Sequence, residues 1–351
     1  MSNYFDNLNE EVRKYFDILS DEIPDFLYEY IETPEMQKQN KISVSCGIIY
    51  SKMYNQMWYS SLDHSIAVAL IIWHFTKDKK QTLSGLFHDI ATPVFKHSID
   101  FMNGDYKKQE STEELTENII RNSNEIMKLL KRDKIKVKEI SNYHIYPIAD
   151  NDTPKLSSDR LEYTFSNGLG ATEKIWTLGD VKEIYSNIEI QKNENEIEEL
   201  GFKDKRIAEK FVHTMSKLSS LYIKNETKFS MQFLADVIKT LIDNNLIKKE
   251  DLYNLSEKEI IKTIEECKTD NISKCFEIWK EATKINESDE EIKDKYSVNI
   301  DNIKIRYINP LVKVGNKYLR INKISEVAKK DIENALNYKT KKYAYLDFEF
   351  K

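Results

Sequence analysis

Residues 84 to 100 read SGLFHDIATPVFKHSID and place two imidazoles and two carboxylates in an otherwise apolar run. The four polar residues are His88, Asp89, His97 and Asp100. Buried imidazoles and carboxylates are costly unless a partner compensates them, and a bound metal ion is one such partner. The stretch therefore indicates a helical core that surrounds a polar centre.

The composition favours helices. The chain has 351 residues, enough for one large domain or two ordinary ones, and 40% hydrophobic with 32% charged residues is typical of a globular protein. Its 20 Tyr and 15 Phe argue against disorder, and only 8 Gly and 6 Pro favour long helices over turn-rich sheet. We expect a mostly α fold, with a multi-helix core, a helical second half and a small C-terminal α/β appendage of a hairpin plus a helix.

The net charge and the cysteine content indicate which partners and which cellular compartment to expect. A formal charge of −6 gives no overall attraction to nucleic acid or to an anionic membrane. Cys46, Cys267 and Cys275 form no C-x-x-C pair, so neither a disulfide framework nor a zinc ribbon is expected. The N-terminal stretch has no apolar signal region, and no run reaches membrane-spanning length. We expect a cytoplasmic, reduced protein with no membrane partner and no strong nucleic-acid signal.

Changes in hydrophobic periodicity and composition along the chain divide it into four segments. Residues 1–40 predict N-terminal helices, 41–173 a metal-binding core, 174–298 a helical extension and 299–351 the α/β appendage.

Local signals refine this division. Residues 66–75 are nearly all apolar and predict a buried helix, and Pro93 is placed in the first turn of a restarting helix. Residues 111–131 predict one amphipathic helix, and a further helix is expected to begin near Ser157 or Ser158. Gly315 with Asn316 predicts a hairpin turn, and residues 342–350 read as a strand.

Four residues form the candidate metal site. His64 opens one predicted helix, His88 and Asp89 close the next, and Asp159 starts a third. Three helices that meet at these ends would direct two imidazoles and two carboxylates at one ion. This donor set suits one divalent ion such as Mn, Fe, Co, Ni, Zn or Mg, with positions left for water and a substrate oxygen.

Three motifs in order resemble the H…HD…D pattern of the HD superfamily of metal-dependent phosphohydrolases. They are LDHSIAVALIIWHF, GLFHDIATPVFKHSID and LSSDRLEYTFSN, and they are most similar to the branch of deoxynucleoside triphosphate triphosphohydrolases. The match covers roughly residues 55 to 170. The resemblance implies that His64, His88, Asp89 and Asp159 are the metal ligands. It also implies that His97 and Asp100 face a small phosphorylated substrate, such as a nucleotide.

The chain departs from that branch at several positions. Ser61 stands where the branch has an arginine, Thr92 and Gln109 stand where it has histidines, and Asn167 replaces an acid. Glu162 replaces the second aspartate of the D-R-x-D-Y motif. Two imidazoles that handle protons and a guanidinium that binds phosphate are thus missing, which argues against carrying over the triphosphate substrate.

The remaining residues suggest roles. His97 and Asp100 are three positions apart on one predicted helical face, so the carboxylate can orient the imidazole for proton transfer. We count these two with Thr92 as catalytic candidates. Lys96, Arg160 and Tyr163 are candidates to replace the missing arginine. Gln109 and Asn167 complete the expected substrate-binding set.

Several alternatives remain open at this point. The four polar residues can simply hydrogen-bond one another, and His74 reads as a core histidine. His144 precedes Asp150 in the loop before the third helix and raises the question of a second ion, although the spacing favours one. The competing functions are an iron-dependent HD oxygenase and a catalytically reduced nucleotide-binding module. Homo-oligomers are compatible with the apolar helical faces.

Overall fold

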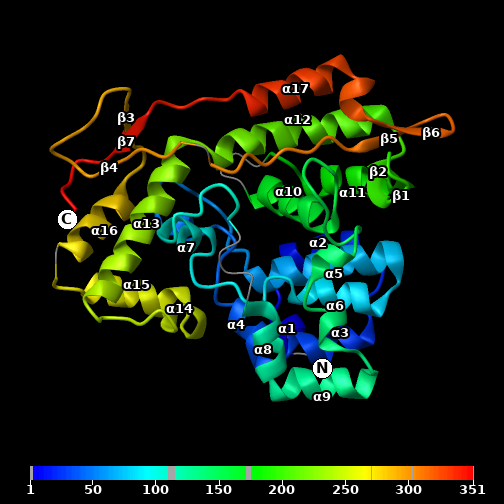
Figure 1. Cartoon of the computed structure of the whole chain (residues 1–351), viewed down its shortest axis with the longest axis horizontal. Helices are drawn as coiled ribbons and strands as arrows, with labels where there is room; N and C mark the ends of the chain where they lie inside the picture. The colour runs from blue at the N-terminus through cyan, green and yellow to red at the C-terminus, as the bar shows by residue number, and fades with distance from the viewer. Residues whose placement is uncertain (1–2, 110–114, 171–174, 270, 302, 351) are drawn as a thin grey trace.

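The chain folds mostly into helices with two small sheets (Figure 1). The structure is a computed structural model that describes residues 3–109, 115–170, 175–269, 271–301 and 303–350. The predicted fold class is confirmed, including the C-terminal region of strands and a helix. No helix within the described ranges is long and apolar enough to cross a membrane.

Helices make up the N-terminal half. They are α1 (Asn3–Asp6), α2 (Glu10–Leu19), α3 (Asp25–Ile31), α4 (Pro34–Gln39), α5 (Ser61–Thr76), α6 (Lys79–Phe87), α7 (His97–Met102), α8 (Thr116–Asn122), α9 (Asn124–Asp133) and α10 (Ser158–Gly170), with short 3-10 turns η1 (Ile48–Tyr50), η3 (Val137–Glu139) and η4 (Tyr143–Ile145). Helix α5 is central, because every side chain from Ser61 to Ile72 is buried and α2, α6 and α10 all pack against it. A helix that is apolar on all sides is stable only when it is covered in this way.

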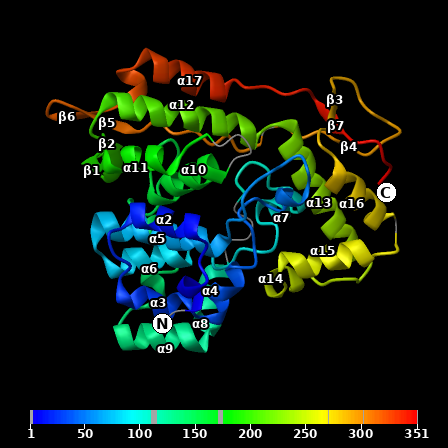
Figure 2. The same ribbon diagram turned by 180° about the vertical axis from the view of Figure 1, so that it is seen from behind.

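The C-terminal half adds longer helices and the strands. They are α11 (Leu178–Ser186), β1 (Ile188–Lys192), β2 (Glu198–Phe202), α12 (Lys205–Tyr222), α13 (Asn225–Asp243), α14 (Asp251–Asn254), α15 (Glu257–Glu266), α16 (Ile272–Glu281), β3 (Asn286–Ser288), β4 (Ser297–Val298), β5 (Leu311–Val314), β6 (Lys317–Arg320), η5 (Ile321–Lys323), α17 (Glu326–Leu336) and β7 (Tyr343–Tyr345). One sheet has the order β1-β2-β5-β6 and the other β3-β7-β4. Both views show α17 lying along α12 at the edge of the molecule (Figures 1 and 2).

The sequence expectations hold in part. The hairpin at Gly315 is confirmed as β5–β6, and α10 begins at Ser158 as expected. The segment expected to be helical contains the β1–β2 hairpin. Ile188 and Ile190 alternate with polar residues in the sequence, as in a strand, although the polar Gln191 is buried as well. The strand expected over residues 342–350 is confined to β7.

Two further expectations need comment. Helix α7 starts at His97 rather than at Pro93, because the chain makes a tight turn through Phe95 and Lys96 first. The helix expected over 111–131 is interrupted at Ser123, which caps α9, and its first residues lie outside the described ranges. The boundary expected at 173/174 also lies outside them, so the four-part division stays a prediction.

Two apolar clusters fill the interior. The first apolar cluster is built from α2, α5, α6 and α10–α12, and the second from α7, α13, α15, α16 and the β7 strand. The turn from His88 to Lys96 passes from one cluster to the other, since Ile90 is buried in the first and Val94 and Phe95 in the second. The stretch from Ser84 to Asp100 therefore connects the two apolar clusters.

A buried carboxyl group ties α15 to the segment before α5. Glu257 is fully buried, and its side chain accepts hydrogen bonds from the Ser43 amide (3.1 Å) and the Tyr50 hydroxyl (3.1 Å). Burial raises the pKa of Glu257 to about 8, because these hydrogen bonds only partly offset the lost hydration. The neutral form therefore predominates in the folded protein at pH 7.

This shift predicts a pH dependence of stability. The folded state holds a proton that the unfolded chain releases above about pH 4.5, so Glu257 makes the free energy of unfolding fall as pH rises from about 4.5 to about 8. Glu257→Gln, which mimics the neutral form, should gain stability over the wild type by about 1 kcal/mol per pH unit in that window. Urea unfolding at pH 5, 6, 7 and 8 measures this difference. Glu266→Gln, at an exposed position of the same helix, is the control, and a pH-independent difference for Glu257→Gln would contradict the assignment.

Candidate active site

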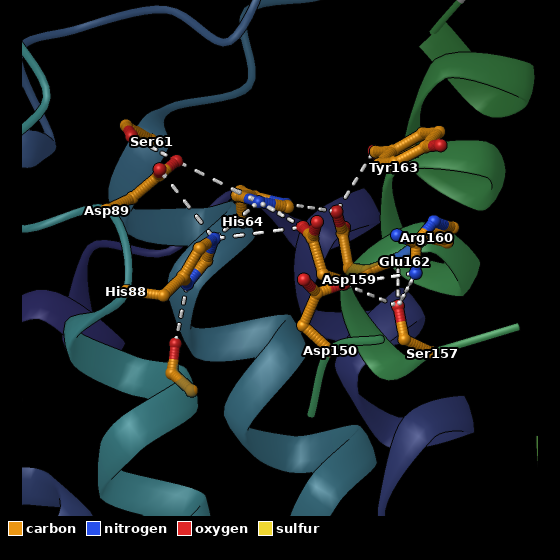
Figure 3. Close-up of polar contacts among 12 residues, drawn as sticks. Ser61, His64, His88, Asp89, Asp150, Ser157, Asp159, Arg160, Glu162 and Tyr163 are labelled. Atoms are coloured by element: carbon orange, nitrogen blue, oxygen red, sulfur yellow. Dashed lines mark hydrogen bonds and ion pairs between the residues drawn. The ribbon is translucent and has the colours of Figure 1, made fainter. Parts of the chain in front are cut away.

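Three helix ends bring the predicted metal-site residues together (Figure 3). His64 lies in the first turn of α5, which Ser60 and Asp63 fix through a reciprocal capping box. His88 is the C-cap of α6, and Asp89 follows it in the turn. Asp159 lies in the first turn of α10, 70 residues later in the chain.

The side chains of these four residues converge. The Nε2 atoms of His64 and His88 are 3.1 Å apart, and Asp159 Oδ1 lies 3.2 Å from the first and 3.7 Å from the second. Asp89 approaches the same two nitrogens with oxygens at 3.9 and 3.7 Å. In the part of the chain that the structure describes, His64, His88 and Asp89 are the one group found with metal-site spacing.

The tautomers of the two imidazoles fit a metal ion. His88 donates its Nδ1 proton to the Gly85 carbonyl at 2.7 Å, and Nδ1 of His64 donates to Glu162. In their neutral forms both rings therefore present a lone pair on Nε2, and two lone pairs at 3.1 Å repel each other unless a cation lies between them. Two nitrogens bound about 2.1 Å from one ion at a right angle would be about 3 Å apart. The donor set thus fits one divalent ion.

Glu162 orients His64 from behind. Its carboxylate is fully buried and accepts hydrogen bonds from the Tyr59 hydroxyl (2.8 Å) and the Tyr15 hydroxyl (3.3 Å) in addition to His64. A carboxylate in this position fixes the tautomer and the direction of a metal-binding imidazole. The residue that replaces the aspartate of the family motif therefore contacts His64 directly.

Electrostatics in the site reflect the same arrangement. Burial alone would lower the pKa of His64, but Glu162 and Asp159 outweigh it and raise that pKa to about 10. Burial opposes ionisation of Asp159 and Asp89 as well, yet the hydrogen bond from His64 holds the pKa of Asp159 below its usual range, and Lys96 does the same for Asp89. When no metal is bound, His64 is therefore protonated, and its positive charge offsets the charge of the nearby carboxylates.

A cavity open to solvent lies beside His88 and Asp89. Its lining residues are His88, Asp89, Ala91, Thr92, Lys96, His97 and Gln109. Twelve residues were predicted from the sequence as catalytic, substrate-binding or metal-binding, and six of them line the cavity: His88, Asp89, Thr92, Lys96, His97 and Gln109. One cation, Lys96, and several polar groups therefore surround the space next to the metal site.

His97 and Asp100 form a hydrogen-bonded pair, as their spacing predicts. His97 Nδ1 donates to Asp100 Oδ2 at 2.9 Å, and the Asp100 side chain is buried. Desolvation lowers the pKa of His97, against the opposing effect of Asp100, so the ring is neutral at pH 7 with Nε2 unprotonated. This nitrogen can accept a proton or a hydrogen bond, and Arg306 Nη2 lies 3.4 Å from it.

Lys96 lies against Asp89 on a strained turn. Its Nζ donates to Asp89 Oδ2 at 2.5 Å and is 3.4 Å from the Ser61 hydroxyl. Phe95 and Lys96 both have positive φ angles, 61° and 42°, which non-glycine residues rarely adopt. Tight packing of the buried Phe95 ring allows this turn, because Gly47 leaves no Cβ where the ring lies.

The structure gives the remaining predicted residues other contacts. Arg160 donates to Asp150 at 3.0 Å and to Asn151 at 2.8 Å, and the Asn167 amide donates to the Tyr163 carbonyl one helical turn earlier at 2.7 Å. The Tyr163 ring packs near Tyr222, and burial raises the pKa of Tyr163 to about 12. None of these three side chains is among the residues that line the cavity, and their substrate-binding roles stay predictions.

His144 is engaged beside the site. Its Nδ1 donates to Asp150 at 2.8 Å, and its ring packs on Tyr143, which in turn packs on His88. It is not part of the group with metal-site spacing. His74 was expected in the core, but its side chain is exposed on the last turns of α5, where the ring contacts Phe75 and Tyr185.

Sequence reasoning missed Arg306. Its Nη2 donates to the Gln109 side-chain oxygen at 2.5 Å and lies 3.4 Å from His97 Nε2. The residue is 147 positions beyond Asp159, in the segment before β5. No local motif marks it, and only the fold brings it to the cavity.

Comparisons with known proteins agree on the fold. No family model matches the chain. The uncharacterised protein YdhJ of Bacillus subtilis is 22% identical over 307 residues, which cover 84% of this chain and 87% of the relative. A hypothetical protein from Aquifex aeolicus superposes with a TM-score of 0.63 at 16% identity, covering 93% of both chains. A phosphohydrolase from Bacteroides thetaiotaomicron superposes with a TM-score of 0.57 at 13% identity, covering 94% of this chain and 97% of the other. The chain therefore shares the fold of these two solved structures over almost its whole length.

Proposed function

We propose that the protein is a metal-dependent phosphohydrolase of the HD type that acts on a small phosphorylated metabolite, with a nucleotide as the leading candidate. The observation that carries this proposal is the convergence of His64 Nε2 and His88 Nε2, with two carboxylates, beside a cavity lined by Lys96, His97 and polar groups. The fold shared with a phosphohydrolase supports it. The single group with metal-site spacing in the described ranges favours one ion over the dinuclear centre that an oxygenase of this type requires.

His64, His88, Asp89 and Asp159 would hold the ion. A divalent metal in this position lowers the pKa of a bound water and polarises a phosphoryl oxygen. Glu162 and the Gly85 carbonyl keep both imidazoles turned toward it. Lys96 neutralises part of the charge of Asp89 and keeps that carboxylate in place.

His97 would handle a proton during hydrolysis. Asp100 holds the ring through Nδ1, so Nε2 faces the cavity and can accept a proton and return it to a leaving oxygen. The cavity walls exclude part of the solvent around that nitrogen, which keeps the ring neutral and able to act as a base at neutral pH. Thr92 and Gln109 border the same space as hydrogen-bonding groups.

Metal binding provides the first test. The wild-type protein should bind about one Mn²⁺ per chain, and His88→Ala should weaken binding by more than the about 10- to 100-fold typical of losing an outer-shell partner. Isothermal titration with MnCl₂ after removal of bound metal measures both. His213→Ala is the matched control, because His213 is half-exposed on α12 and hydrogen-bonded to Asp331. Undiminished Mn²⁺ affinity in His88→Ala would overturn the proposed centre.

Hydrolysis provides the second test. The Mn²⁺-loaded protein is assayed for phosphate release from nucleotides and from small phosphomonoesters. Asp100→Asn removes the carboxylate that orients His97 and should lower kcat by about 10²- to 10⁴-fold while Mn²⁺ affinity is kept. Asp17→Asn changes an exposed carboxylate on α2 and should leave kcat unaltered. Wild-type turnover in Asp100→Asn would remove His97 from the proposed mechanism, and tight nucleotide binding without any release of phosphate would favour the nucleotide-binding module.

A further inference from the structure

The guanidinium of Arg306 lies against two residues that line the cavity, Gln109 and His97, and forms no ion pair with an acid of the described ranges. Its Nη2 contacts an amide oxygen of Gln109 and lies near the neutral His97 ring. Across the described part of the chain, no carboxylate forms an ion pair with Arg306 or with Arg13, whereas Arg121, Arg132, Arg160, Arg206 and Arg320 each have one. A partly buried cation held only by neutral groups retains its full attraction for an anion.

The fold fixes where this guanidinium lies. The Ser219 hydroxyl on α12 donates to the Arg306 carbonyl, and the Lys304 amide donates to the Tyr106 carbonyl at 3.0 Å. The Asn309 amide donates to the Pro154 carbonyl at 2.8 Å. Backbone contacts on both sides of Arg306 thus hold the segment against α12 and against two loops of the N-terminal half.

Gln109 keeps the Arg306 side chain directed at the cavity. Gln109 is buried, lines the cavity and accepts from Nη2, while the Tyr222 ring lies 6.0 Å from the guanidinium carbon on another side. The remaining N–H groups of a planar guanidinium form a fork that matches two oxygens of a phosphate. Lys96, the other cation at the cavity, already pairs with Asp89.

We infer that Arg306 binds the phosphate of the substrate, and that Gln109 is the positioning residue that holds the guanidinium when the cavity is empty. This inference rests on the proposed function in taking a phosphorylated substrate. It adds an arginine from a distant segment in place of the one absent at position 61, and it assigns to Gln109 a role through Arg306 rather than direct contact with the reacting atoms.

Binding of inorganic phosphate tests the inference without turnover. Phosphate is titrated calorimetrically into Mn²⁺-loaded wild type, Arg306→Gln, Arg306→Lys and Gln109→Ala. Loss of a charge-assisted pair of hydrogen bonds predicts a Kd about 10- to 100-fold weaker for Arg306→Gln. Arg306→Lys should lie between this variant and the wild type, since it keeps the charge but loses the fork. Gln109→Ala should weaken binding less than Arg306→Gln.

The controls separate this inference from the proposed function. Arg206→Gln, at a side chain 89% exposed on α12, should bind phosphate as the wild type does. Phosphate affinity equal to the wild type in an Arg306→Gln protein that still binds Mn²⁺ would overturn the inference, and if that variant does not fold, equal affinity in Arg306→Lys does so. Arg306-dependent phosphate binding without hydrolysis of any phosphate ester would count against the proposed function alone. Hydrolysis with an unchanged KM in Arg306→Gln would count against Arg306 alone.

Discussion

The site depends on two imidazoles whose Nε2 atoms face each other at 3.1 Å inside the protein. His64 and His88 each use Nδ1 for a fixed acceptor, so neither can relieve the repulsion between the Nε2 atoms by rotating its ring. Such an arrangement is stable only with a positive charge between the rings, whether a proton or a metal ion. The surrounding helices supply what this charge needs, because α5, α6 and α10 all begin or end at the site.

The support for this centre extends well beyond the residues nearest to it. Tyr15 on α2 and Tyr59 before α5 both donate to Glu162, and Tyr4 on α1 donates to Asp63, which caps α5. The N-terminal helices therefore stabilise the position of His64 through hydrogen bonds as well as through apolar packing. A buried carboxylate with several donors is rigid, which a preformed metal site requires.

The sequence predicted those parts of the site that lie close together in short motifs. His88 with Asp89, and His97 with Asp100, can be recognised because they share a turn or a helical face, and His64 and Asp159 because they open apolar helices. Arg306 could not be found in this way, since a single arginine in an irregular segment has no periodicity and its position depends on contacts with Ser219 and with Tyr106 on either side of it. The β1–β2 hairpin was missed for a related reason, because short charged strands resemble charged helix faces until their pairing is known.

The turn between the two apolar clusters couples the geometry of the site to the packing of the interior. Ile90 is buried in the first apolar cluster and Phe95 in the second. The distance between His88, which follows α6, and His97, which begins α7, therefore depends on how the two clusters pack against each other. Phe95 and Lys96 already have unfavourable positive φ angles. The turn therefore cannot easily change its conformation when either apolar cluster shifts. Substitutions that change the volume of either apolar cluster would therefore alter the position of His97 relative to His88. Packing far from the site thus sets the distance between these two histidines.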